Sequence, residues 1–508
     1  MIIKEKIKRG NLLKLSVTIL TVILPILALY FLLIVNGKGL NPQIFIPTFN
    51  DEVSWFSQVE SMIKYGRTLG YEGYNLTHAT VGTYGAWGVA SLIPYALIGL
   101  IIGWDLHSMV IANVILLSFA IAVFIWLTKP NMQQLLWLGA GYLCMNITIG
   151  YSMLAMAESL RYALAIVLAG MLIKLYNGEQ SKIFKYVVLP IVLFYAIQVY
   201  LIFALLVPIY IFGILKEKKL YMRLTVSVVT TGIVACLSNY LCGLVTAPYV
   251  VSTREGLLQG ILNNPYQGMV EVLRTFFFNA KTLNPVTLIN LVSYDETGTY
   301  MWFFFIYWIM IGWIGKQVLA KKSFYYNVSF YLLIGFLGGY CALYTGECST
   351  LCRGLNTGIV FIVFFLVHES DKRGMKLFIL LSFLGCISSW WYYTNRIEKK
   401  DTAYAHSAHI LEEREKINKI VDISKENEIW GNTIAHYGTV SNVYLELPIG
   451  IGTNYMIDES LNTKARWAAV SKCDEEVYFK ARLEKLMENH HKIVYENEDL
   501  VILEYMDF

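Results

Sequence analysis

Long apolar stretches, separated by short polar segments, recur from Leu15 to about Trp391. Runs of roughly 17–25 apolar residues are long enough to cross a bilayer as helices. In hydrocarbon only helices or closed barrels satisfy every backbone hydrogen bond, and these runs lack the alternating polarity of barrel strands. The pattern therefore predicts an all-α polytopic membrane protein.

Basic clusters between the apolar stretches indicate how the chain threads the membrane, because Lys and Arg favour the cytoplasmic side. Placing all of them in the cytoplasm predicts about 11 crossings, within a range of about 11–13 transmembrane helices. Between Lys185 and Lys216 we expect two short helices that meet near residues 198–200, and at 89–103 a short or re-entrant helix. Full crossings are expected near 15–35, 107–127, 132–152, 160–176, 221–243, 300–319, 324–345, 353–369 and 375–393.

This threading divides the chain into a membrane domain, residues 1–394, and a soluble extracytoplasmic α/β domain, residues 395–508. The protein is expected in the cell membrane with its N-terminus in the cytoplasm. Outer loops are expected at 36–106 and 245–299. In the tail the pattern predicts a helix at 408–419 and strands at 443–447, 467–472, 492–495 and 500–505, the last two as a hairpin.

Composition adds limits on function. The chain is 56% hydrophobic and 15% charged, with a net charge of +4, which gives no reason to expect a nucleic-acid partner. The sequence contains no Gly-rich phosphate loop, His-Glu-x-x-His or Gly-x-Ser-x-Gly motif. Nucleotide-driven transport and cytoplasmic nucleotide-sugar chemistry therefore have no support.

Two adjacent acids, Asp51 and Glu52, follow the first crossing and open an amphipathic helix whose apolar residues lie between 53 and 63. Such a helix can lie in the membrane interface. Its N-terminus favours an ionised carboxylate, which is the form a general base requires. The alternative is that Asn50 or Asp51 only caps the helix.

Charged pairs also fall at the predicted outer ends of later crossings: Glu158 with Arg161, and Glu347 with Arg353. Charges in membrane segments usually face a cavity or a partner, and an arginine there can bind a phosphate through two hydrogen bonds. The alternative is two structural ion pairs. His78, in the first outer loop, is either structural or part of the same site.

Metal ligands are not evident in the sequence. A divalent metal, Mg²⁺ or Mn²⁺, is a possible cofactor, but the single carboxylate pair Asp51–Glu52 does not make a metal site. His406 and His409 in the tail lack a carboxylate or cysteine arranged to complete one. We therefore assign no residue as a metal ligand.

Together these features resemble the GT-C superfamily of membrane glycosyltransferases, which includes protein O-mannosyltransferases and aminoarabinose transferases. The resemblance rests on the basic N-terminus, the acidic pair opening the first outer loop, the Glu158–Arg161 turn, and Arg353 in Cys352-Arg353-Gly354-Leu355. It also includes His78 with Tyr84-Gly85-Ala86-Trp87-Gly88 leading into Pro94-Tyr95, and the outer C-terminal domain.

The resemblance implies a hexosyl- or pentosyltransferase that uses a polyprenyl-phosphate sugar as donor. The acceptor would be a glycan, lipid or protein on the outer face of the membrane. It implies Asp51 as the base, Glu52 orienting the base or the acceptor, and Arg161 and Arg353 neutralising the leaving phosphate. Glu158, Glu347 and His78 would support them.

Two alternatives remain at this stage. A transporter or flippase of lipid-linked glycans predicts charges through the membrane midplane and an internal repeat, and the sequence shows neither. A polysaccharide polymerase or ligase predicts essential arginines in a large late loop, so Arg254 and Arg274 would then matter more than Asp51.

Overall fold

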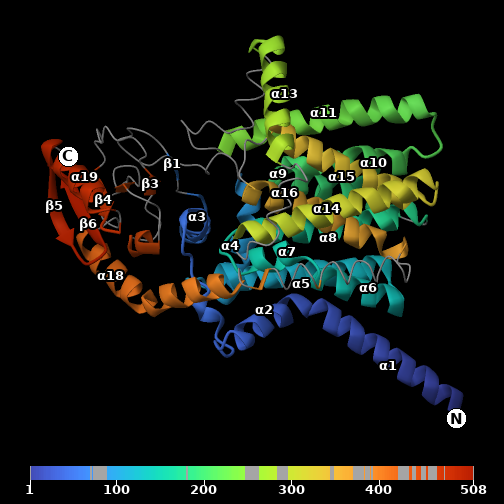
Figure 1. The fold of residues 1–508 in the computed structure, drawn as a ribbon, viewed down its shortest axis with the longest axis horizontal. Coiled ribbons are helices and arrows are strands. Elements are labelled where there is room, and N and C mark those ends of the chain that lie inside the picture. The colour runs from blue at the N-terminus through green and yellow to red at the C-terminus, as the bar shows by residue number, and fades with distance from the viewer. Residues whose placement is uncertain are drawn as a thin grey trace.

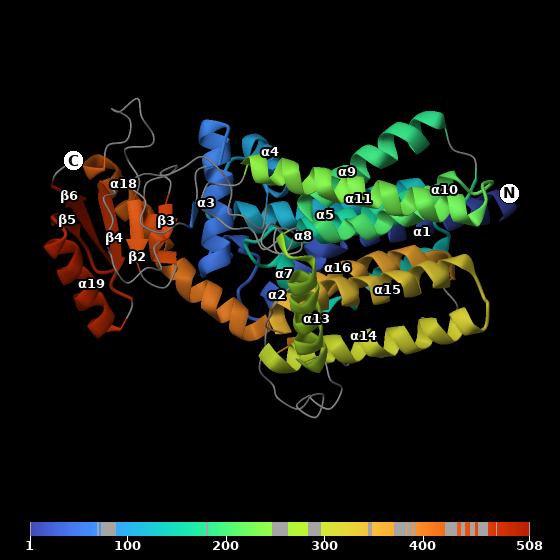
Figure 2. The same cartoon turned by 90° about the horizontal axis from the view of Figure 1, so that it is seen from above.

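The computed structural model describes residues 2–68, 71–72, 88–178, 181–245, 263–282, 296–343, 348–369, 383, 389–390, 393–421, 434–437, 442–447, 453–455, 466–473 and 475–506. It has two lobes, a bundle of helices and a smaller lobe around a sheet (Figure 1). The N-terminus lies at the far end of the bundle from the sheet, and the C-terminus lies in the sheet lobe (Figures 1 and 2).

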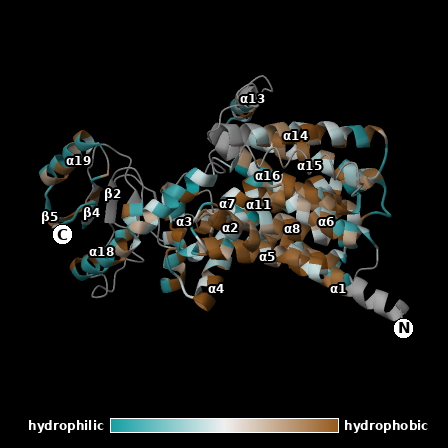
Figure 3. Ribbon diagram, turned by 60° about the horizontal axis from the view of Figure 1, so that its bottom comes forward, coloured by the Kyte–Doolittle hydropathy of each residue, from teal (hydrophilic) through white to brown (hydrophobic). Residues whose placement is uncertain are grey.

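The bundle contains most of the described helices and most of the apolar residues (Figure 3). Its helices are α1 (Ile2–Val22), α2 (Leu24–Val35), α4 (Ile93–Ile102), α5 (Ser108–Thr128), α6 (Met132–Leu143), α7 (Asn146–Ser152), α8 (Glu158–Tyr176), α9 (Leu189–Val199), α10 (Leu206–Ile214), α11 (Leu220–Val245), α13 (Pro265–Thr282), α14 (Glu296–Leu319), α15 (Phe324–Leu343) and α16 (Cys348–Phe365).

Within the described residues, five helices are long and apolar enough to span a membrane, or six if the bent α1–α2 pair counts as one. They are Ser108–Thr128, Glu158–Tyr176, Leu220–Val245, Trp302–Leu319 and Cys352–Glu369. The spans formed by α8 and α16 are each 83% buried inside the protein and form its core. Several apolar helices crossing together confirm the expected all-α multi-pass membrane protein.

The predicted helices agree with the structure at some positions and differ from it at others. The short helices predicted at 89–103 and on either side of 198–200 are confirmed, since α9 ends at Val199 and Tyr200 is extended. The single crossing predicted at 132–152 is wrong, because the helix breaks between α6 and α7. At this break, Asn146 Oδ1 accepts a hydrogen bond from Ile147 N, and Asn146 Nδ2 donates one to the Ser389 hydroxyl. The crossing predicted at 375–393 lies mostly outside the described residues.

The second lobe has a six-stranded mixed sheet in the order β1-β3-β2-β4-β6-β5. Its strands are β1 (Tyr71–Glu72), β2 (Ile434–Tyr437), β3 (Thr453–Tyr455), β4 (Trp467–Ser471), β5 (His491–Glu496) and β6 (Leu500–Tyr505), with helices α18 (Ser407–Ile420) and α19 (Glu476–Glu488). The predicted helix, the strand at 467–472 and the hairpin are therefore confirmed. Unexpectedly, β1 comes from the loop predicted at 36–106 and pairs in parallel with β3.

The strand predicted at 443–447 is wrong, because those residues form the 3₁₀ turn η9 (Asn442–Glu446). Its Leu445 carbonyl accepts a hydrogen bond from Arg414 Nε at 2.6 Å, so this backbone pairs with a side chain of α18 rather than with a strand. The domain boundary predicted at 394 stays a prediction, and residues 393–405 are helical across it.

Alternating residues pack the two faces of the sheet. Ala468, Val470, Val501 and Leu503 face α19 in one apolar cluster. Their neighbours face α18 and α3 (Asn50–Tyr65) in another, whose residues include Val53, Phe56, Ile410, Trp467, Ala469, Leu500 and Ile502. Helix α3 therefore lies between the lobes (Figure 2). The membrane-interface position expected for its apolar face is wrong for Val53 and Phe56, which are buried against protein.

A buried ion pair fixes the start of α3. Glu52 is fully buried, and Lys400 Nζ lies 2.5 Å from its Oε1 and 2.7 Å from its Oε2. The same carboxylate accepts hydrogen bonds from Thr48 N, Thr48 Oγ1 and Ala155 N at 2.7–2.8 Å. Lys400 also donates to the Ile46 carbonyl at 2.6 Å. Glu52 thus joins α3, the α7–α8 connection and the helix that leads to the sheet lobe.

Glu52→Gln should destabilise the protein by about 3–5 kcal/mol, because it leaves the Lys400 ammonium buried without its anion. Burial already lowers the pKa of Lys400, and the Glu52 charge opposes that shift. The measurement is thermal unfolding of the purified protein in detergent, where we expect a clear drop in Tm.

Asp401→Asn is the matched control. It breaks the more exposed Lys38–Asp401 pair, with an N–O distance of 2.7 Å, one position along the same helix. Such a pair contributes about 0–1 kcal/mol, so Tm should change little. Adding Lys400→Met to Glu52→Gln should recover part of the loss. Equal effects of Glu52→Gln and Asp401→Asn would contradict the anchoring role.

Candidate functional site

Asp51 lies next to Glu52 but faces a different partner. It sits in the first turn of α3, and Arg353 Nη1 of α16 donates to its Oδ2 at 3.0 Å. Both side chains keep about a quarter of their surface exposed, 28% for Asp51 and 24% for Arg353. The pair is therefore accessible to a ligand on one side, whereas Glu52 is fully enclosed.

Glu158 continues this charged group into the bundle. Its Oε1 lies 3.7 Å from Arg353 Nη1 and 3.5 Å from Arg161 Nη1, so one buried carboxylate stands between two guanidinium groups. Arg161 also stacks on the ring of Tyr200, with its guanidinium carbon 4.2 Å from the ring centre. Two acids and two arginines thus meet at one end of the bundle, and their formal charges cancel.

Two helix N-termini lie at the same end. Glu158 is the first residue of α8, and Arg353 lies near the start of α16. The Tyr162 hydroxyl donates to the Arg353 carbonyl at 3.0 Å, which places the two helix starts side by side. Helix N-termini carry partial positive charge and favour anions. With both arginines, this end of the bundle is suited to an anionic group.

The structure brings together four of the sequence-predicted site residues: Asp51, Arg353, Glu158 and Arg161. Glu52 lies one residue away, but its carboxylate points to Lys400 and the protein interior. His78, Glu347 and the segment 84–87 lie outside the described residues. Arg274 is exposed on α13, the helix that projects from the bundle in Figure 1.

Sequence reasoning missed two residues. Lys400 lies in the charged run Glu398-Lys399-Lys400-Asp401, and nothing in that run distinguishes the one buried lysine. Tyr200 was noted only as part of a helix junction, although its extended backbone, which interrupts the helices, presents the ring to Arg161. A tyrosine at a helix break near a buried arginine is the signal that could have indicated it.

A group that could hold a divalent metal lies in the sheet lobe. It consists of His409, Glu446 and Asp499, and one ligand atom from each lies within 4.8 Å of the others. The expectation that His409 lacks a carboxylate partner is therefore wrong. Glu446 and Asp499 are far from it in sequence and only folding brings them to α18.

Known proteins resemble this chain in structure and not in sequence. No protein-family model matches the sequence, and no curated protein matches it at the level of sequence. Among solved structures, ArnT from Cupriavidus metallidurans bound to undecaprenyl phosphate is similar, with a TM-score of 0.50 and 10% identity over 96% of this chain and 97% of that one. The apo state of the same protein gives 0.49, also with 10% identity over 96% and 97%.

The oligosaccharyltransferase of Archaeoglobus fulgidus, crystallised with Zn and sulfate, is also similar, with a TM-score of 0.46 and 10% identity. The match covers 84% of this chain and 64% of that one, which is the longer protein. At such identities the likeness concerns the fold. The ArnT match runs over nearly the whole of both chains, including the C-terminal lobe. The chain therefore has the fold of ArnT, in agreement with the multi-pass helical fold and C-terminal domain that its sequence led us to expect.

Proposed function

We propose that this protein is a membrane glycosyltransferase that moves a sugar from a polyprenyl-phosphate donor to an acceptor at the outer face of the membrane. The observation that carries the proposal is the accessible Asp51–Arg353 pair beside Arg161 and two helix N-termini. It combines a carboxylate that can accept a proton with a cationic position for a phosphate. The shared fold with ArnT, which was crystallised with undecaprenyl phosphate, supports a lipid-phosphate donor.

In the proposed reaction, Asp51 is the general base. The acceptor hydroxyl or amine gives its proton to the Asp51 carboxylate as its oxygen or nitrogen bonds to the anomeric carbon. The bond between that carbon and the phosphate oxygen breaks, and its electron pair leaves with the polyprenyl phosphate. Proton removal of this kind requires the ionised carboxylate.

Arg353 and Arg161 are the proposed phosphate-binding residues. A guanidinium offers several N–H groups in one plane and suits phosphate oxygens. When a donor phosphate binds Arg353, it competes with Asp51 for the same cation and leaves the carboxylate free to face the acceptor. Glu158 then holds both arginines in place from the buried side. Glu52 orients the base by fixing the first turn of α3.

The basic connections between helices support the proposed sidedness of the site. The N-terminus and the α10–α11 and α14–α15 connections lie at the end of the bundle away from the sheet lobe (Figures 1 and 2). These connections contain Lys216, Lys218, Lys219, Lys321 and Lys322. Lys and Arg favour the cytoplasm, so the site and the sheet lobe are proposed to face the outside.

The charges favour this reading over a transporter. In the five described spans, every Asp, Glu, Lys and Arg lies within four residues of a span end. A transporter with a midplane binding site predicts charges deeper in its helices. For a polymerase or ligase, Arg254 lies outside the described residues, and Arg274 is exposed on α13 rather than beside Asp51.

Asp51→Asn should reduce sugar transfer by about 10²–10⁴-fold, because it removes the proton acceptor. The amide oxygen can still accept a hydrogen bond from Arg353, so donor binding should be kept and the loss should be in kcat. The measurement is release of polyprenyl phosphate from a panel of radiolabelled polyprenyl-phosphate sugars by purified protein. Asp401→Asn should retain full turnover, and unchanged turnover in Asp51→Asn would rule out the base assignment.

Arg353→Lys should weaken transfer by about 10–100-fold, which is the scale of losing a hydrogen bond to a charged group. A lysine keeps the charge but lacks the planar set of donors, so we expect a higher KM for the donor. Arg274→Lys is the control and should leave both constants unchanged. If Arg274→Lys abolished activity while Arg353→Lys did not, a polymerase or ligase would become the better assignment.

A further inference from the structure

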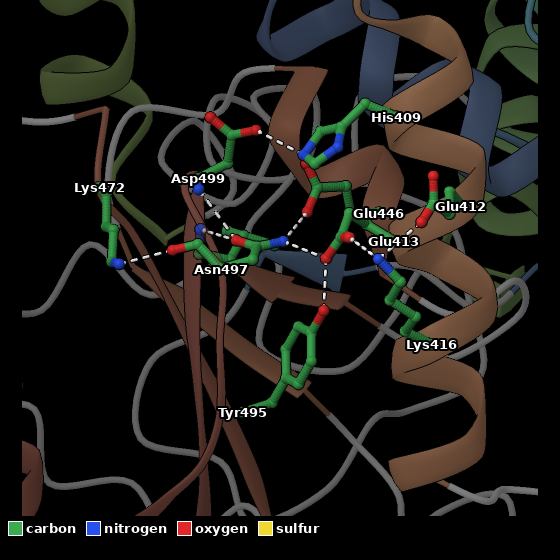
Figure 4. A network of polar contacts seen from close by, with 10 residues as sticks. His409, Glu412, Glu413, Lys416, Glu446, Lys472, Tyr495, Asn497 and Asp499 are labelled. Carbon is green, nitrogen blue, oxygen red and sulfur yellow. Dashed lines mark hydrogen bonds and ion pairs between the residues drawn. The ribbon is translucent and has the colours of Figure 1, made fainter.

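The sheet lobe contains a second group of ionisable side chains, apart from the Asp51–Arg353 pair. His409 comes from α18, Glu446 from the end of η9, and Asp499 from the turn between β5 and β6. The three side chains point toward one another, as Figure 4 shows, and His409 Nε2 lies 3.6 Å from Asp499 Oδ2. One possible ligand atom of each lies within 4.8 Å of the others.

Glu446 supplies an observation independent of this clustering. Its side chain is fully buried, and Asn497 Nδ2 donates to its Oε2 at 2.8 Å. Its Oε1 is also buried, yet it has no hydrogen-bond partner within the described part of the chain. His409 Nε2 is in the same situation. Leaving a buried carboxylate oxygen without a partner is costly, so this geometry indicates a missing ligand.

The neighbouring cations do not fill that role. Lys416 Nζ lies 2.8 Å from both Glu412 and Glu413, and Lys472 bonds to Glu496 and the Asn497 carbonyl. Among the residues that the structure describes, no Lys or Arg forms an ion pair with Glu446 or Asp499. The Glu446 carboxylate is buried, and the carboxylates of Asp499 and Glu413 lie near it. A divalent cation between the two carboxylates would compensate for the burial of the Glu446 charge and for its repulsion from Asp499.

The backbone around the group is already fixed. Asn497 Oδ1 accepts hydrogen bonds from Asp499 N at 2.9 Å and Leu500 N at 2.7 Å, which holds the hairpin turn. The Asp499 carbonyl accepts from Lys472 N at 2.8 Å. Glu446 is held through Asn497, which also donates to Glu413 (Figure 4). Only the His409 and Asp499 side chains would need to close on an ion.

We propose that His409 Nε2, Glu446 Oε1 and Asp499 Oδ2 bind one divalent transition-metal cation, zinc in particular. Mg²⁺ and Ca²⁺ take oxygen ligands, whereas one imidazole with two carboxylates suits zinc. The 3.6 Å between His409 Nε2 and Asp499 Oδ2 is too long for a hydrogen bond. It is close to the separation, roughly 3.4 Å, of two ligands on a tetrahedral zinc with bonds of about 2.0–2.1 Å.

The proposed ion has an open side. Glu446 and Asp499 both line a cavity of about 870 Å³ between the lobes, whose walls also include Arg396 and Lys399. Three protein ligands would leave a fourth position for water or for an anionic group in that cavity. The site is independent of the proposed transferase activity, because it needs none of the residues assigned to sugar transfer.

The test is zinc binding by the purified full-length protein in detergent. After exposure to ZnCl₂ and exhaustive dialysis, elemental analysis should find one zinc per chain, and calorimetry should give its Kd. His409→Gln, Glu446→Gln and Asp499→Asn should each weaken binding by at least about tenfold, the scale of a lost interaction to a charged group. The control is His406→Gln, because His406 lies one helical turn from His409 and lines the same cavity as Glu446 and Asp499. This variant should bind zinc normally.

A second measurement separates ligand loss from misfolding. Zinc should raise the Tm of the wild type, because an ion that binds only the folded state stabilises it. Glu446→Gln should fold without zinc, since it removes a buried charge, and its Tm should not respond to the ion. The proposal would be overturned if the wild type bound no zinc, if a variant that combines His409→Gln, Glu446→Gln and Asp499→Asn still bound it, or if His406→Gln lost it to the same extent. None of these readouts depends on sugar transfer.

Discussion

The buried contact between Glu52 and Lys400 is the constraint on which the arrangement of the site depends. Each charge would be unfavourable alone in the interior, so the two segments that carry them must meet. Their meeting fixes the first turn of α3, where Asp51 lies, against the α7–α8 connection through Ala155. It also attaches the helix leading to the sheet lobe. The position of Asp51 is therefore set by a lysine of the opposite half of the chain.

The four charged side chains of the site balance one another without a ligand. Asp51, Glu158, Arg161 and Arg353 pair among themselves, with Glu158 on the buried side and Asp51 on the open side. Glu158 is enclosed by protein and contacts both arginines from the buried side. In the proposed reaction, Asp51 is the partner that an incoming phosphate replaces. Two acids of the same formal charge thus differ in role through burial alone.

The sequence predicts what depends on local pattern. Apolar runs reveal the spans, the acidic pair marks the start of α3, and the period of two residues reveals the β5–β6 hairpin. It does not predict contacts between distant segments. Lys400 resembles its charged neighbours, Glu446 lies in a stretch with the alternation of a strand, and Asp499 belongs to an ordinary turn. Each acquires its significance from a partner that only the folded chain brings near.

Strand β1 gives the assembly of this protein a definite order in time. Tyr71 and Glu72 belong to the first outer loop, but they pair with Asn454 and Tyr455, which are synthesised some 380 residues later. At about 5–20 residues per second, this edge of the sheet waits for roughly 20–80 s after the loop has emerged. Tyr71 and Glu72 must remain without their strand partner until the tail has been synthesised. The last quarter of the chain therefore completes a structure that the first quarter begins.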